Sequence, residues 1–220
     1  MTPADTSDRT IGRLLAASAV ALVLTHWLRL LPLGFAAPGA TRYEDFVDLL
    51  TPFVVAGPAL AALAVVGPSR RDWVLALLAT AAFVQGHALH LAANSISYAR
   101  GPAAPVELWD EVVGHAIWFV GLALLVAVVA TTTREHVPPP GVAGWALAAL
   151  CGLTWAANVV EGGLVPLGSV LATGLVGLGS RLGGATGRLL VVAFAVSLTL
   201  VAAYGLWRGG FPQPSELGWL

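Results

Sequence analysis

Residues 73–94 read WVLALLATAAFVQGHALHLAAN, and this stretch decides the fold class of the chain. It carries no Asp, Glu, Lys or Arg, and it is as long as the roughly 20 apolar residues that a helix needs to cross a bilayer. Six further mostly apolar segments, with few charged residues, lie at 11–33, 46–66, 109–131, 142–160, 164–179 and 189–207. Backbone groups must bond internally in lipid, so segments of this length are predicted to be helices. The sequence therefore predicts an all-α, polytopic membrane bundle of seven transmembrane helices, forming one integral membrane domain over 1–220.

The composition agrees with this fold class. Of the 220 residues, 57% are hydrophobic and only 10% are charged, whereas soluble domains carry about 25% charge. The 11 basic residues balance 12 acidic ones, which excludes the basic surface of a nucleic-acid-binding protein. Cys151 is the only cysteine, so a metal site would have to use His, carboxylate or amide groups. The lipid bilayer is the partner that this composition predicts, and the oligomeric state stays open.

The arginines predict an orientation. Seven lie on the side of the N-terminus and four on the other, which by the positive-inside rule favours N-in, C-out topology, and we expect a multi-pass protein of the plasma membrane. Small residues at 36–40 could form a signal-peptidase site, but the preceding apolar run is long and favours a retained first helix. The sixth segment is short, rich in glycine and contains Pro166, so it could be re-entrant.

Ionisable residues gather at one end of the predicted bundle. His87, His90 and Asn94 follow the spacing i, i+3, i+7, which places them on one stripe of the third segment. In the fourth segment, Glu111 and His115 stand at i, i+4 on one face. His87 lies roughly 10 Å and His90 roughly 6 Å below the level of Asn94, and His115 lies roughly 9 Å below the start of its segment. Three imidazoles are therefore predicted at similar depth on neighbouring helices.

This set of side chains has the chemistry of a metal site. Three neutral imidazoles with a carboxylate suit zinc, and additional carboxylates suit iron or manganese, so we expect a divalent metal and favour zinc over iron. The predicted ligands are His87, His90, His115 and Asp110. The predicted catalytic bases are Glu111, Asp48 and Glu161. Structural hydrogen bonding of the histidines and solvation of the acids at helix ends remain the alternatives. Most tryptophans, Trp118 among them, are interpreted as part of the interfacial aromatic belt.

Seven helices with three histidines and acidic residues at one end resemble the intramembrane zinc hydrolases of the alkaline ceramidase and adiponectin-receptor type. In that family one metal histidine lies on an early helix and a His-x-x-x-His pair lies on the last. Here the pair His87 and His90 is spaced i, i+3 on the third segment, and the last segment has no histidine. The likeness covers topology and ligand types, so no catalytic residue is carried over. It implies metal-dependent hydrolysis of a lipid amide or ester.

Three other functions use similar residues. Two histidines on facing helices could bind a haem axially and make an electron carrier. A di-iron oxidase would use the additional carboxylates, although the Glu-x-x-His pairs of such bundles do not occur in the sequence. A proton-coupled transporter could use intramembrane histidines and acids as a relay.

Overall fold

The computed structural model describes all residues except 1–2, 29–30, 32, 35–40, 102 and 220. The described chain is all-α, and seven of its helical segments are long and apolar enough to cross a membrane. The predicted positions 36–40 of a cleavage site lie outside the described residues. The elements run α1 Pro3–Leu28, α2 Tyr43–Asp48, α3 Thr51–Val66, α4 Arg70–Arg100, α5 Ala104–Glu107, η1 Leu108–Gly114, α6 His115–Thr133, α7 Val142–Glu161, α8 Val165–Leu182 and α9 Gly184–Arg208.

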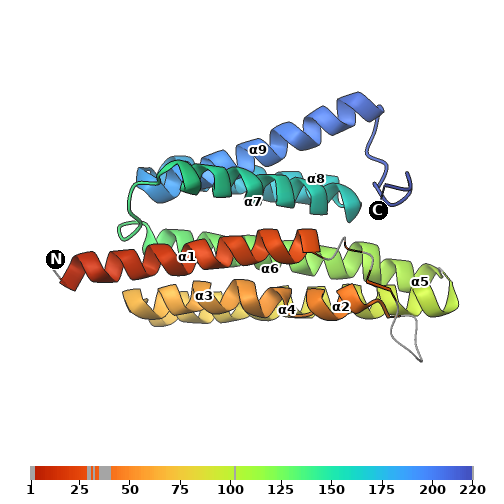
Figure 1. The fold of residues 1–220 in the computed structure, drawn as a ribbon, viewed down its shortest axis with the longest axis horizontal. Coiled ribbons are helices and arrows are strands. Elements are labelled where there is room, and N and C mark those ends of the chain that lie inside the picture. The colour runs from red at the N-terminus through yellow and green to blue at the C-terminus, as the bar shows by residue number, and fades with distance from the viewer. Residues whose placement is uncertain (1–2, 29–30, 32, 35–40, 102, 220) are drawn as a thin grey trace.

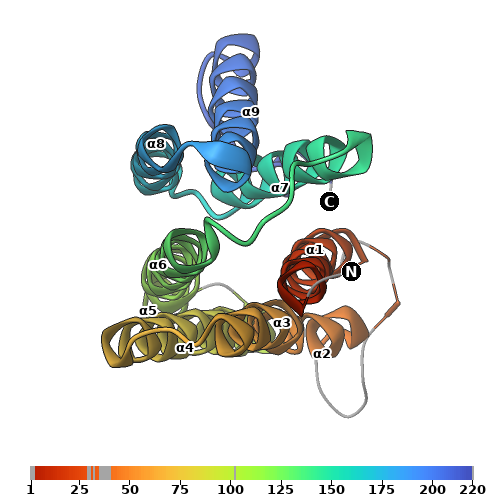
Figure 2. The same ribbon diagram turned by 90° about the vertical axis from the view of Figure 1, so that its left-hand side faces the viewer.

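The helices run side by side along the long axis of the molecule, with the two chain ends at opposite ends of the bundle (Figure 1). Seen along the helices, α3 and α4 form one row, α1 and α6 lie over that row, and α7, α8 and α9 gather beyond them (Figure 2). Trp27 of α1 donates its indole N–H to Thr154 of α7 at 3.2 Å, so this hydrogen bond joins α1 to the group formed by α7, α8 and α9. Phe119, Trp155 and Phe194 form an aromatic core between α6, α7 and α9.

Two prolines explain where predicted spans differ from observed helices. The segment predicted at 46–66 is divided into α2 and α3, and Pro52 lies in the first turn of α3. Proline has no N–H, so it cannot donate to the carbonyl four residues earlier, which is that of Asp48. Pro166 likewise lies in the first turn of α8, where proline is well tolerated. It therefore begins an 18-residue helix and does not interrupt one.

The fourth predicted span contains a π-helix. Residues Leu108–Gly114 form η1 between α5 and α6, and a π-helix closes i→i+5 hydrogen bonds where an α-helix closes i→i+4 bonds. The prediction that Glu111 and His115 share a face assumed α-helical geometry. The wider turn aligns His115 with the residue five positions earlier, Asp110, whose carbonyl oxygen lies 2.8 Å from His115 Nδ1. π-helical segments inside α-helices are frequently found at functional sites.

Glycines allow α4 and α6 to meet at backbone distance. A Cβ atom on Gly86 would lie 2.3 Å from the backbone nitrogen of Trp118, and one on Gly114 would lie 3.0 Å from the backbone nitrogen of His90. Small residues at a helix contact favour close packing in membranes, where lipid provides little apolar driving force. The close approach brings the polar stripe of α4 directly against η1 and the start of α6.

Candidate metal centre

The polar centre of the bundle consists of His90 from α4, Asp110 from η1 and His115 from the first turn of α6. One ligand atom from each of the three side chains lies within 4.8 Å of the other two, and all three residues are buried. The imidazole ring centres of His90 and His115 are 4.3 Å apart. Two nitrogen ligands and one carboxylate at this spacing could hold a metal ion.

Hydrogen bonds fix the orientation of both imidazoles in this group. His115 Nδ1 donates to the backbone carbonyl of Asp110 at 2.8 Å, so in the neutral ring Nε2 carries the lone pair. His90 Nδ1 forms a short hydrogen bond with the Asp110 carboxylate. Histidines that bind metals characteristically bond through their second ring nitrogen to a carbonyl or a carboxylate. The hydrogen bonds of the centre therefore match those that support metal ligands.

Gly162, the residue after α7, makes room for His115. A Cβ atom at this position would lie 2.7 Å from His115 Cδ2 and 3.1 Å from its Nε2. The φ and ψ of Gly162 are −79° and 7°, which other residues also adopt, so the site requires a small side chain and not an unusual backbone. At the end of α7, Gly162 therefore places a backbone without a side chain against the imidazole.

His87 lies one turn before His90 on α4 and pairs with Asp48 of α2. Its Nε2 lies 2.9 Å from the Asp48 carbonyl oxygen and 3.3 Å from the Asp48 carboxylate, which also accepts a hydrogen bond from Thr51 at 2.8 Å. This is the carbonyl that Pro52 leaves without its helical donor. The ring centres of His87 and His90 are 6.3 Å apart. The structure thus brings His87, a predicted ligand, into contact with Asp48, a predicted base, beside the His90/Asp110/His115 group.

Trp118 lies among the three histidines, although sequence reasoning assigned it to the aromatic belt. It is only 3% exposed, and its ring centre is 5.1 Å from that of His87, 6.3 Å from that of His90 and 5.5 Å from that of His115. The spacing His115 to Trp118 is i, i+3, so the two side chains share one stripe of α6. That stripe was the sequence signal that could have identified Trp118.

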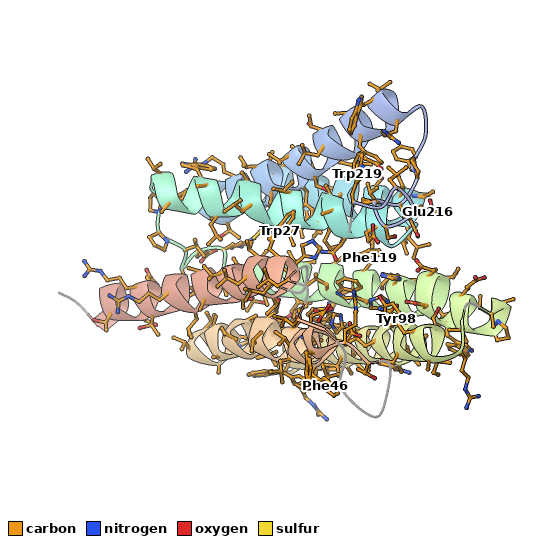
Figure 3. All side chains as sticks on the ribbon, turned by 45° about the vertical axis from the view of Figure 1, so that its right-hand side comes forward. Trp27, Phe46, Tyr98, Phe119, Glu216 and Trp219 are labelled. Atoms are coloured by element: carbon orange, nitrogen blue, oxygen red, sulfur yellow. The ribbon has the colours of Figure 1, made fainter. Side chains whose placement is uncertain are left out.

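Besides Asp48, the predicted bases are Glu111 and Glu161, and both contact the C-terminal segment that follows α9. Gln213 Nε2 donates to Glu111 at 3.1 Å, and the backbone N–H of Ser215 donates to Glu161 at 3.1 Å. Glu216 of this segment lies at the same end of the bundle as Tyr98 of α4 (Figure 3). No pattern in the sequence indicated that the residues after α9 fold back onto this end.

A cavity of about 610 Å³ opens between this C-terminal segment and the α4–η1 end of the bundle. Asp110 lines it and also belongs to the buried His/Asp/His group. Its remaining polar lining consists of Asn94, Ser97, Glu107, Glu111, Gln213 and Glu216. The cavity therefore reaches one candidate metal ligand, Asp110, from the end of the bundle that carries most of the acidic residues.

Arg42 neutralises two further acids at this end. It forms a 2.8 Å ion pair with Asp45, lies 3.8 Å from Glu44, and places its guanidinium 4.9 Å from the centre of the Tyr98 ring. Burial lowers the pKa of the Arg42 guanidinium, but the hydrogen bond with Asp45 and the charges of Tyr98, Asp45 and Glu44 together outweigh burial and raise it. Asp45 and Glu44 are thus held by a cation, in contrast to Asp110.

Fold and site define a class of protein: an all-α bundle whose seven apolar helices could span a membrane and whose buried His90/Asp110/His115 group could bind a metal. No protein-family model, curated protein or solved structure matches the chain. These comparisons thus do not add to the resemblance to the alkaline ceramidase and adiponectin-receptor type. The features that the structure supports are seven long apolar helices and a buried group of two histidines and one aspartate.

Proposed function

We propose that this chain is an N-in, C-out plasma-membrane protein, a single integral domain that binds one divalent metal and hydrolyses a lipid amide or ester. The metal would be held by His90, Asp110 and His115, and zinc is favoured over iron. The observation that carries the proposal is the burial of this group together with a cavity of about 610 Å³ that one of its members, Asp110, lines. Ionisable groups at membrane depth are costly unless they pair, bind a metal or line a water-filled cavity.

The ligand set fits zinc in number and type. Two imidazoles and one carboxylate are three protein ligands, which is the number that catalytic zinc sites use while one position stays open to water or substrate. Zinc bound there would lower the pKa of a water molecule and polarise a carbonyl group. Asp110 would also orient His90, and Gly162 would keep space beside His115.

The three predicted bases have different positions relative to this centre. Glu111 lines the cavity and is next to Asp110 in the chain, so it is the acid best placed to exchange protons with a substrate that enters from the cavity. Glu161 holds the C-terminal segment through Ser215 and would act by keeping the cavity wall in place. Asp48 would act through His87, which was predicted as a ligand and for which we propose a separate role below.

Two of the three rival functions fit these residues less well, haem binding because of the geometry and a di-iron centre because of the sequence. Imidazoles that bind opposite faces of one haem iron leave the porphyrin plane between them, and ring centres 4.3 Å apart leave no such gap between His90 and His115. A di-iron centre would use Glu-x-x-His pairs from two helices, and the sequence contains none. A proton-coupled transporter would use the same histidines as a relay but would not consume lipid.

The proposal is tested by elemental analysis and an absorption spectrum of detergent-purified protein, together with turnover of a fluorescent ceramide and a fluorescent diacyl ester. We expect about one zinc per chain, no Soret band and turnover of one substrate. A His90→Ala, His115→Ala variant should lose both metal and turnover. His136→Ala is the matched control, because His136 pairs with Asp8 in a half-exposed contact away from this centre. Metal-free wild-type protein, or metal retained in the double variant, would contradict the site.

A further inference from the structure

Two buried polar atoms beside the candidate metal centre have no hydrogen-bond partner among the described residues. They are Nδ1 of His87 and Nε1 of Trp118, in side chains that are 1% and 3% exposed. A buried donor or acceptor without a partner is unfavourable, so we expect a bound group to satisfy these two atoms. The two rings pack edge to face, with centres 5.1 Å apart and planes at 83°.

The two atoms are complementary. Because a carbonyl oxygen can only accept, the contact with the Asp48 carbonyl at 2.9 Å requires His87 Nε2 to carry the hydrogen. In the neutral imidazole, Nδ1 is then an acceptor, whereas the indole nitrogen of Trp118 is a donor only. A single hydroxyl group satisfies both, since its oxygen accepts from the indole and its hydrogen is donated to the imidazole.

The two rings that carry these atoms are in direct edge-to-face contact, with their centres 5.1 Å apart. One oxygen atom can bond two nitrogens at about 2.9 Å each, so a single small group can bridge neighbouring rings. Buried water molecules typically occupy sites of this kind, where they complete otherwise unsatisfied polar groups. The same two rings also border the candidate metal centre, at 6.3 Å from His90 for each of them.

We infer that His87 and Trp118 bind the water molecule that attacks the substrate, with His87 as its proton acceptor and Asp48 as a positioning residue. This inference rests on the proposed hydrolysis. Asp48 holds the imidazole by its carbonyl and carboxylate oxygens, an arrangement that keeps one tautomer and one orientation, as in the acid–histidine pairs of hydrolases. Pro52 contributes by leaving the Asp48 carbonyl open to His87.

The proposed step transfers a proton from the water to His87. One O–H bond of the water breaks, its proton moves to His87 Nδ1, and the oxygen forms a bond to the carbonyl carbon of the substrate. The carbonyl π pair moves onto the carbonyl oxygen. When that pair returns, the C–N or C–O bond to the leaving group breaks, and the leaving group takes the proton from His87. The products are a carboxylic acid and an amine or an alcohol.

The water site is tested by NMR on protein labelled with ¹⁵N at the tryptophan indoles and reconstituted in nanodiscs. The chain has eight tryptophans, and Trp118→Phe identifies the Trp118 signal by its loss. We expect a downfield, hydrogen-bonded indole proton with a cross-peak to water, weakened in His87→Ala. The matched control is Trp155→Phe, since the buried Trp155 donates to the Gly168 carbonyl at 3.3 Å and should show no water contact. A Trp118 proton without a water cross-peak would overturn the inference.

The role of His87 is tested separately from the metal site. In His87→Ala the zinc content should stay at the wild-type level while ceramide or ester turnover falls by about 10²–10⁴-fold, the usual contribution of a general base. Trp118→Phe should keep zinc and lower turnover about tenfold. Loss of zinc in His87→Ala would show a ligand and contradict this role. If the wild type has zinc and turnover but His87→Ala is fully active, only this inference fails; if the wild type binds no metal, the proposed function fails.

Discussion

Replacement of Gly162 by alanine should weaken metal binding without unfolding the bundle. The added Cβ would lie 2.7 Å from His115 Cδ2 and 3.1 Å from Nε2, while ordinary contacts begin near 3.4 Å. The backbone at Gly162 suits alanine, so we expect the contact to be relieved by a displacement of the imidazole by several tenths of an ångström. Metal–ligand distances tolerate about ±0.2 Å, so the displaced ring is a poorer ligand.

We expect the dissociation constant for zinc to rise about 10–100-fold, the usual effect of disturbing a group that supports a ligand. Competition with a chromogenic chelator in detergent measures the constant. Gly174→Ala is the matched control, because a Cβ there meets nothing within 4 Å. Both variants should unfold within a few degrees of the wild type. Unchanged zinc affinity in Gly162→Ala would refute the placement of His115 Nε2 beside Gly162 as a metal ligand.

Two further substitutions test how the fold builds the site. Gly86→Ala would place a Cβ 2.3 Å from the backbone nitrogen of Trp118, so α4 and α6 must move apart. The midpoint temperature of thermal unfolding should then fall well below that of Gly174→Ala. An unchanged midpoint would contradict the close approach of the two helices. Pro52→Ala restores an N–H that competes for the Asp48 carbonyl. Histidine ¹⁵N NMR should then show His87 leaving the single Nε2–H tautomer, and an unchanged His87 spectrum would contradict the role of Pro52 in the His87–Asp48 pair.

The helices were predictable because each span carries a sustained apolar pattern that only a helix can satisfy in lipid. The prediction of an all-α chain with seven such segments is confirmed. Two helix boundaries differ from the predicted ones because of prolines. Pro52 divides the span predicted at 46–66, and Pro166 lies in the first turn of α8, which the sequence analysis treated as a possible re-entrant segment. Both follow from the missing N–H of proline, which a hydropathy pattern does not register.

The candidate site was predictable only in part. Depth along the helices correctly brought His90 and His115 together, because it depends only on the rise per residue. Asp110 was among the predicted ligands, but its alignment with His115 was not predicted, because it depends on the π-helix. An α-helical turn would have aligned Glu111 with His115. The C-terminal residues Gln213 and Glu216 could not be placed, because their position depends on a chain reversal after α9 that carries no periodic pattern.

Binding of one divalent metal by His90, Asp110 and His115 together can be measured by X-ray absorption at the zinc edge of metal-loaded protein. We expect one zinc per chain with two imidazole nitrogens at about 2.0–2.1 Å and oxygen in the remaining positions, reduced to at most one imidazole in His115→Ala. A shell of oxygen atoms only, or the same two imidazoles in the His115→Ala variant, would contradict it.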